Sequence, residues 1–431
     1  MVTTSRYVGT QYFVQNRGRR NPPQRVMFRA VLLFSSMCII WPSIAFSQVP
    51  LGPDASAKVG RMLDSLPAHD TLKCTIHDWK PFLDFTFRFD AGYFVRCPYE
   101  EFGGEEFRLA TYTRVTPQGG SPMVFAELMA VPAVPPDVAA KTNLKRLHAE
   151  LDMSGGFSIG EGEYQVEVLV TDNRNRFCRR RWNIKAARSH SQAEIAVALE
   201  ANTVSHIWPD PWDGKLADKG QGYRVTILLD AMPMNPRESR LRVWDRAFLM
   251  QSLRSMLQHL PCESVRLVAF NLDQQRELYR QEHFDSEAFR ELAKILRTTE
   301  LGTVSYKALQ RGPEGVSFLS DLVRKESAGS QPSDIVVFLG PTTRFGQKVP
   351  ANLAPPSQGQ HFFYFEYFPF PGANFPDSIQ HLISVLQGTT YQMHSPTDFS
   401  KAMQKMLGQL DREREAEKRE AAPSPSLSPR N

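Results

Sequence analysis

The sequence lacks the residue patterns that mark the commonest metal and redox sites. Its ten histidines form no H-E-x-x-H or H-x-H motif, and its five cysteines include no C-x-x-C pair. Metalloproteases, zinc ribbons and dithiol oxidoreductases rely on these spacings, because the spacing brings the ligands or thiols together on one helix or turn. The chain therefore offers no motif for these classes of protein.

A convincing catalytic motif is also missing. Gly156-Phe157-Ser158-Ile159-Gly160 matches the G-x-S-x-G of serine hydrolases, but that motif needs a strand before the serine and a helix after it. Here Glu161-Gly162-Glu163 leads into a strand, so a glycine-rich turn is the simpler interpretation. We predict that the protein is not an enzyme. An exported hydrolase that uses Ser158, or an acid pair among Glu100-Glu101 and Glu105-Glu106, is an alternative.

No apolar run has the length of a membrane span. The longest run, residues 30–41, is shorter than the roughly 20 residues that a span needs, and Pro42 follows it. Arginines precede the run, and Ala45-Phe46-Ser47 supplies small residues at the spacing of a signal peptidase site. We predict a secretory signal peptide over residues 1–47, with Met27 as an alternative start and an uncleaved anchor as the alternative.

An excess of positive charge is missing from the mature chain. Six of the 51 basic residues are arginines within the first 47 positions, which leaves 45 basic against 46 acidic residues. A chain near neutrality gives no reason to expect nucleic acid or an anionic membrane as a partner. We predict a secreted or periplasmic protein, without a membrane span after signal cleavage, whose partner is a protein in the cell envelope or outside the cell.

Four cysteines remain after signal cleavage: Cys74, Cys97, Cys178 and Cys262. An even number of cysteines in an exported chain is compatible with disulfides, and four allow three pairings. Buried free thiols are the alternative, because a domain of this size does not need covalent links. All four are therefore disulfide candidates.

The region 48–188 has the pattern of an all-β domain. Short strands separated by proline and glycine clusters are expected at residues 82–89, 107–115, 123–131, 164–172 and 177–184. In residues 164–172 the side chains of Tyr164, Val166, Val168 and Val170 share one face. This spacing predicts an immunoglobulin-like sandwich.

The region 222–411 has a different pattern, in which strands alternate with helices. It follows a linker at 189–221 and starts with the apolar strand 223–231. Further buried strands are expected near residues 265–270, 335–339 and 362–365. The predicted fold class is therefore α/β, a Rossmann-like doubly wound parallel sheet preceded by the all-β sandwich. Residues 412–431, charged and then rich in Ser and Pro, are predicted to be a disordered tail.

The second domain resembles the von Willebrand factor type A fold. The features that carry the resemblance are the strand ending in Asp230, the segment 301–309, the strand 334–339 with the Gly340-Pro341 that follows it, and the closing helices. With the preceding β domain, the chain resembles secreted bacterial proteins described as VWFA-related. Asp230 ends the first strand, and ligands of open parallel sheets bind at that end.

The resemblance implies a metal site that this sequence only partly retains. The fold usually places Asp-x-Ser-x-Ser after the first strand, a threonine in a second loop and an aspartate in a third. Here the run is Asp230-Ala231-Met232-Pro233-Met234, Thr303 occupies the threonine loop, and the third loop, 340–343, has no acid. Two ligands make a poor magnesium cage, so we expect no cofactor, with magnesium at Asp230 and Thr303 as the alternative.

The predicted function is binding of another protein without catalysis. The binding surface would be the upper loops of the second domain around Asp230, Thr303, Thr342 and Phe370. Phe370 belongs to an apolar loop, residues 368–376, that holds three prolines and three phenylalanines. A metal-dependent adhesin and an exported hydrolase are the alternatives.

Overall fold

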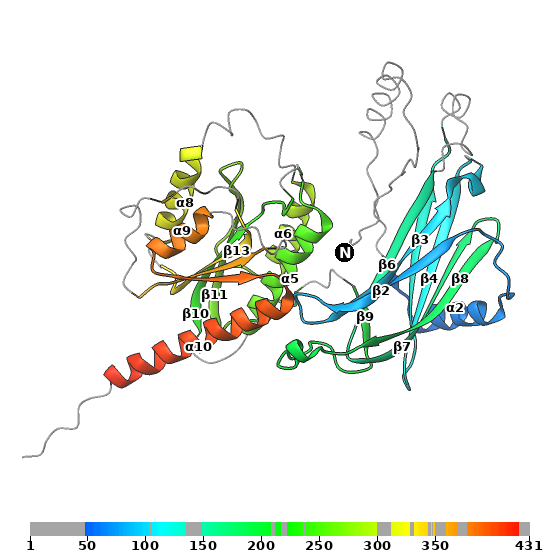
Figure 1. Cartoon of the computed structure of the whole chain (residues 1–431), viewed down its shortest axis with the longest axis horizontal. Coiled ribbons are helices and arrows are strands. Elements are labelled where there is room, and N and C mark those ends of the chain that lie inside the picture. Colours follow the sequence, from blue (N-terminus) through cyan, green and yellow to red (C-terminus); the bar gives the residue numbers. More distant parts are fainter. Residues whose placement is uncertain are drawn as a thin grey trace, which may run out of the picture. The chain divides into compact units, whose positions relative to one another are not determined.

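The structure is a computed structural model of the whole chain (Figure 1). It describes residues 48–421 except 104, 135–148, 208–211, 217–221, 236–237, 239, 300–311, 328–331, 344–345, 347, 350–358 and 369–376. The predicted signal peptide therefore lies outside the described residues. The chain divides into two compact units, of which unit 1 holds most residues up to Ile207 and unit 2 most of the remainder.

Unit 1 contains two β-sheets. The five-stranded sheet has the order β1-β5-β4-β7-β8, and each of its pairs is antiparallel. The four-stranded sheet has the order β2-β3-β6-β9. The strands are β1 (Val49–Pro50), β2 (Thr75–Leu83), β3 (Phe89–Pro98), β4 (Phe107–Pro117), β5 (Met123–Val131), β6 (Glu150–Ile159), β7 (Gly162–Asp172), β8 (Phe177–Ala186) and β9 (Val204–His206).

Side chains from the two sheets meet inside unit 1. Phe125 of β5 stacks on Phe157 of β6, and the Tyr93 hydroxyl of β3 lies 2.6 Å from the Thr113 hydroxyl of β4. Strand β4 alternates buried and more exposed positions, as expected for a sheet with one face toward a core. Helix α2 (Pro53–Ser65) adds a smaller apolar cluster with β5, β7 and β8.

Unit 2 is built on a six-stranded sheet of order β12-β11-β10-β13-β14-β15. Its strands are β10 (Tyr223–Asp230), β11 (Cys262–Asn271), β12 (Arg276–Gln281), β13 (Ile335–Pro341), β14 (His361–Tyr367) and β15 (Thr389–Met393). The helices are α5 (Val243–His259), α6 (Ser286–Thr298), α8 (Gly312–Ser327), α9 (Ser378–Val385) and α10 (Pro396–Ala421). Buried residues of α8 and α9 form one apolar cluster with β10, β11, β13 and β14.

The predicted fold class was wrong. The chain is mostly β, with 39% of its residues in strands, which form three sheets, and 31% in helices. It is not an α/β protein organised by one doubly wound parallel sheet. The six-stranded sheet is mixed, because β12 pairs antiparallel with β11. The sequence pattern missed β12 because its residues are polar and charged, as is common for an edge strand.

The two units exchange segments along the chain. Unit 2 includes Leu83–Phe87, which starts at the last residue of β2 and continues into the connection to β3, and also Ser189–Ala196. The next segment, Val197–Ile207, belongs to unit 1, so the predicted linker at 189–221 is divided between the two units. Within unit 2, the Phe85 ring contacts the rings of Phe248, Tyr367 and Phe399, with centroids 5.0 to 5.8 Å apart.

The last helix is longer than the sequence suggested. Helix α10 continues to Ala421, so residues 412–421, assigned to a disordered tail, are helical. The Arg414 guanidinium lies 4.4 Å from the centre of the Tyr223 ring, and Glu413 pairs with His361 at 3.2 Å. These contacts attach the charged part of the helix to β10 and β14. Across the described residues, no helix is both long and apolar enough to span a membrane.

Candidate functional site

The structure brings together two of the four residues predicted to form the binding loops. Asp230 ends β10, and Thr342 directly follows the neighbouring strand β13. The strands run parallel with Leu229 beside Leu339, so both residues lie at the carboxyl end of the sheet. Thr303 and Phe370 lie outside the described residues.

Asp230 is buried rather than presented to solvent. Only 1% of the residue is exposed. Gly340 of β13 lies directly against it, since a Cβ atom on Gly340 would sit 2.6 Å from the Asp230 Cβ. Glycine at 340 therefore allows β10 and β13 to approach closely at this end. Asp230 does not reach the surface, whereas Thr342 is half-buried and does.

Asp377 joins the loop after β13 to the start of α9. Its Oδ1 accepts hydrogen bonds from the backbone N–H groups of Ile379 at 2.7 Å and Gln380 at 3.1 Å, which caps the helix. Its Oδ2 accepts the Thr343 N–H at 2.6 Å and the Tyr364 hydroxyl at 3.2 Å. Burial raises the pKa of the Asp377 carboxyl, and these hydrogen bonds oppose that change.

Asp245 fixes the loop after β10 in a similar way. It lies in the first turn of α5 and is 4% exposed. One carboxylate oxygen accepts the Met234 N–H at 3.0 Å, and the other accepts the Arg242 N–H at 2.6 Å. Burial raises the pKa of this carboxyl as well. Met234, which follows β10, and Thr343, which follows β13, are thus each held by a buried aspartate.

Two further titratable residues lie inside this end of the sheet on β14. Tyr364 is fully buried, and burial together with the nearby charge of Asp377 raises the pKa of its hydroxyl well above the usual value. Burial raises the pKa of Glu366 too, with a smaller contribution from Asp377. Gln392 of β15 donates to Glu366 at 3.2 Å. The site is therefore an acidic interior at the carboxyl end of the sheet.

The arrangement supports loop positioning more directly than chemistry. Among the described residues, no group of three or more His, Cys, Asp or Glu side chains is placed to hold a metal ion. Ser158 lies within β6, 2% exposed, and its hydroxyl donates to Asp90 at 2.7 Å. The G-x-S-x-G segment is thus part of a strand, and the serine is not at the strand-to-helix turn that a nucleophile elbow requires.

Two of the four candidate cysteines form a disulfide and two are free thiols. Cys74 and Cys178 form a disulfide in unit 1, with Cα atoms 6.2 Å apart. Cys97 and Cys262 are buried free thiols, and burial raises the pKa of each to about 12.

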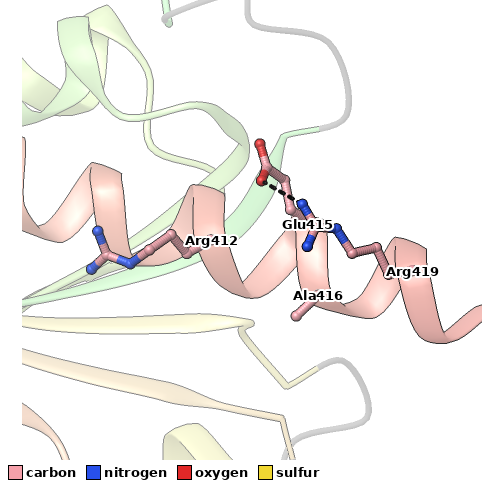
Figure 2. Close-up of a pocket in the computed structure, with 4 residues that line it drawn as sticks. All are labelled: Arg412, Glu415, Ala416 and Arg419. Carbon is pink, nitrogen blue, oxygen red and sulfur yellow. Dashed lines mark ion pairs between the residues drawn. The ribbon is translucent and has the colours of Figure 1, made fainter.

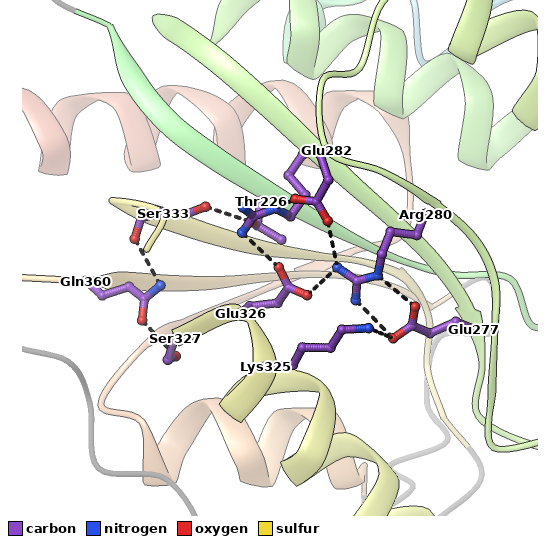
Figure 3. Close-up of polar contacts among 10 residues, drawn as sticks. Thr226, Glu277, Arg280, Glu282, Lys325, Glu326, Ser327, Ser333 and Gln360 are labelled. Carbon is purple, nitrogen blue, oxygen red and sulfur yellow. Dashed lines mark hydrogen bonds and ion pairs between the residues drawn. The ribbon is translucent and has the colours of Figure 1, made fainter. Parts of the chain in front are cut away.

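A second polar cluster in unit 2 connects β11, β12 and α8 (Figure 3). Glu326 of α8 is 1% exposed and pairs with Arg280 at 2.8 Å and Arg266 at 3.2 Å. Arg280 also makes two hydrogen bonds to Glu277, which accepts a third from Lys325 at 3.1 Å. Because each buried charge has an opposite partner, this cluster is a structural connection between the edge of the sheet and α8.

A shallow hollow on α10 is lined by Arg412, Glu415, Ala416 and Arg419 (Figure 2). All four residues are exposed, and Arg419 pairs with Glu415 one turn away at 4.0 Å. An exposed pair of this kind contributes little free energy, so the hollow does not form a defined site.

Sequence reasoning missed Asp245, Glu366 and Asp377. A signal was present for Asp377, since an aspartate directly before an amphipathic helix is a standard N-cap. Glu366 is an isolated acid within a run of aromatic strand residues, which indicates a buried charge. No local pattern distinguishes Asp245 from an ordinary acid in the first turn of a helix.

Comparisons with known proteins give no family for this chain. No family profile and no curated protein matches it. A red sea bream transglutaminase structure aligns over 32% of this chain and 19% of its own length, with 12% identity and a TM-score of 0.19. A Bacteroides thetaiotaomicron lipoprotein aligns over 32% of this chain and 98% of its own, with 10% identity and a TM-score of 0.16.

A β-glucuronidase 2 from Bacteroides uniformis, in a calcium-binding mutant, aligns over a larger part of this chain. It covers 73% of this chain and 38% of its own length, with 9% identity and a TM-score of 0.17. At these TM-scores none of the three likenesses supports a conclusion about fold or activity.

Proposed function

We propose that this chain is an exported, non-enzymatic protein-binding module whose binding surface is formed by the loops at the carboxyl end of the six-stranded sheet. The observation that carries the proposal is that Asp245 and Asp377 hold backbone groups of these loops in place. Both carboxylates accept backbone N–H groups of the loops after β10 and β13. Loop residues held in this way lose little conformational freedom on binding, which favours recognition of a partner.

Two other observations support the proposal. Asp230 and Ser158 are almost completely buried, so neither is accessible to a substrate in this structure. The Cys74–Cys178 disulfide is the kind of bond that persists in oxidising compartments outside the cytosol, which supports export.

A site-specific photo-cross-linker tests the proposal. One variant carries the cross-linker at Thr342, in the candidate loops, and the matched control carries it at Glu263, an exposed residue at the opposite, amino-terminal end of β11. The proposal expects a saturable adduct with one envelope or extracellular protein from position 342 alone. The absence of an adduct, or the same adducts from both positions, would overturn it.

A further inference from the structure

Gln48 is the residue that follows the predicted signal cleavage site, and its side chain is built into the interior of unit 1. The residue is 7% exposed. Its Oε1 accepts the Gly156 N–H of β6 at 3.1 Å, and its Nε2 donates to the Thr113 hydroxyl of β4 at 3.1 Å. Nε2 also lies 3.5 Å from the Tyr93 hydroxyl of β3. The amide thus connects the two sheets.

Hydrogen-bonding groups surround this amide in the interior of unit 1. The Thr113 and Tyr93 hydroxyls are hydrogen-bonded to each other, so the Gln48 amide extends an existing buried network. Glycine at 155 makes room for the Tyr93 hydroxyl, since a Cβ atom there would lie 2.2 Å from the hydroxyl oxygen. The backbone carbonyl of Gln48 also contacts Nε2 of His206 in β9. Buried polar groups require such partners.

A glutamine at the start of a chain has a reaction that internal glutamines do not have. The free α-amine attacks Cδ of its own side chain, a bond forms between that nitrogen and Cδ, and Nε2 leaves as ammonia. The product is a five-membered lactam, pyroglutamate, which has no side-chain NH2 group. No oxidant or other reactant is consumed.

We propose that signal cleavage leaves Gln48 as the first residue of the mature protein, and that the fold protects this residue from cyclisation by holding its amide between the two sheets. Cyclisation requires Cδ to bend back onto the α-nitrogen, which the hydrogen bonds to Gly156 and Thr113 prevent. It also removes Nε2, the donor to Thr113. The side-chain amide of Gln48 therefore fixes the start of the mature chain to both sheets, and the residue stays an uncyclised glutamine.

This proposal depends on the predicted signal peptide but not on the proposed binding function. The cross-linking experiment reads out the loops of unit 2, whereas the experiment here reads out the N-terminus of unit 1. Either proposal can therefore fail while the other stands.

The test follows the uncatalysed cyclisation of the full-length exported protein in buffer and in denaturant, by mass spectrometry of the N-terminal peptide. We expect a chain that begins at Gln48 and loses one ammonia at least about tenfold more slowly when folded than in denaturant, because reaction requires local opening. A different first residue, or equal rates in the folded and denatured protein, would overturn the proposal.

Two threonine variants sharpen the test. Thr113→Val removes the hydroxyl that accepts from Nε2, and we expect faster cyclisation in the folded variant than in the folded wild type. Thr116→Val changes a half-buried threonine of the same strand that makes no described contact with Gln48, and we expect the wild-type rate. Equal rates in the two variants would show that the Thr113 contact does not protect Gln48. The comparison of folded with denatured wild type decides the proposal even if Thr113→Val does not fold.

Discussion

Thr343 donates its backbone N–H to the Asp377 carboxylate at 2.6 Å, across 34 residues of sequence. The same carboxylate caps α9. The loop that follows β13 and the helix that follows β14 are therefore held by one side chain, and this connection leads to the first prediction.

Replacing Asp377 with alanine should cost more stability than an ordinary loss of a helix cap. A cap contributes about 1 kcal/mol, and each buried donor left without a partner costs a further 1–3 kcal/mol or so. We expect a loss of roughly 3 kcal/mol in urea unfolding. Asp285→Ala is the matched control, because Asp285 caps α6 but its described bonds reach only that helix. Equal losses in the two variants would contradict the role assigned to Asp377.

Phe85→Ala should destabilise unit 2, although Phe85 lies between two strands of unit 1 in the sequence. Removing a buried phenylalanine costs about 3–5 kcal/mol, because a cavity remains among its neighbours. Hydrogen exchange should therefore accelerate in α5, β14 and α10, whose aromatic rings surround Phe85.

The control for that experiment is Phe102→Ala. Phe102 stacks on Phe107 with ring centroids 3.8 Å apart inside unit 1. Faster exchange should then be confined to unit 1. A Phe85→Ala protein in which only unit 1 exchanges faster would show that the segment Leu83–Phe87 does not support unit 2.

Acid should weaken the cluster around Arg280. Hydrogen bonds from Arg280 hold the pKa of Glu277 below its usual 4.5, although partial burial opposes them. Because the pKa is lowered in the folded state, the stabilisation is present above pH 4.5 and is lost as the pH falls through the folded value. The effect should stay below about 1 kcal/mol, since the group is partly exposed.

Urea unfolding of Glu277→Gln across the acid range tests this expectation. The variant should lose less stability than the wild type as the pH falls below 4.5, the usual pKa of a glutamate. Asp321→Asn, which removes an exposed pair with Arg324, serves as the comparison and should leave the acid dependence close to that of wild type. A Glu277→Gln profile parallel to the wild type would contradict the prediction.

Breaking the Cys74–Cys178 disulfide should lower the stability of unit 1. The bond joins residues 104 positions apart, and closing a loop of about that length restricts the unfolded chain by roughly 4–5 kcal/mol in the chain-entropy description. We expect a lower melting temperature in the double variant Cys74→Ser with Cys178→Ser. The single variant Cys262→Ala, which removes a free thiol, should change it much less. Similar shifts in both proteins would count against a stabilising disulfide.

The sequence predicted the buried elements of the fold better than its edges. The strands around Ile227, Val337 and Phe363 are continuous apolar runs, and their short length favours a buried strand over a buried helix. β12 and β15 have no such pattern, because edge strands expose polar side chains. Without β12 the sheet was predicted to be wholly parallel, whereas it is mixed.

The sequence predicted where the candidate site lies in the fold, but not which of its residues are buried. Asp230 was correctly placed at the end of a strand, but the local sequence does not reveal that Gly340 closes over it. Likewise, the local sequence does not reveal that Arg179 and Arg181 of β8 both pair with the buried Glu167 of β7. Burial of a charge depends on partners distant in sequence, and periodicity carries no information about them.

The exchange of segments between the two units sets the order in which the chain can complete its fold. The Ser255 hydroxyl donates to the Phe85 carbonyl at 2.6 Å, a contact between residues 170 positions apart. During synthesis the phenylalanines of the Leu83–Phe87 segment therefore remain exposed to solvent until the strands and helices of unit 2, their packing partners, have been synthesised. Contacts between such distant residues slow folding and prolong the exposure of apolar surface. A nascent chain released after β8 would be prone to aggregation, and chaperones are most needed in that interval.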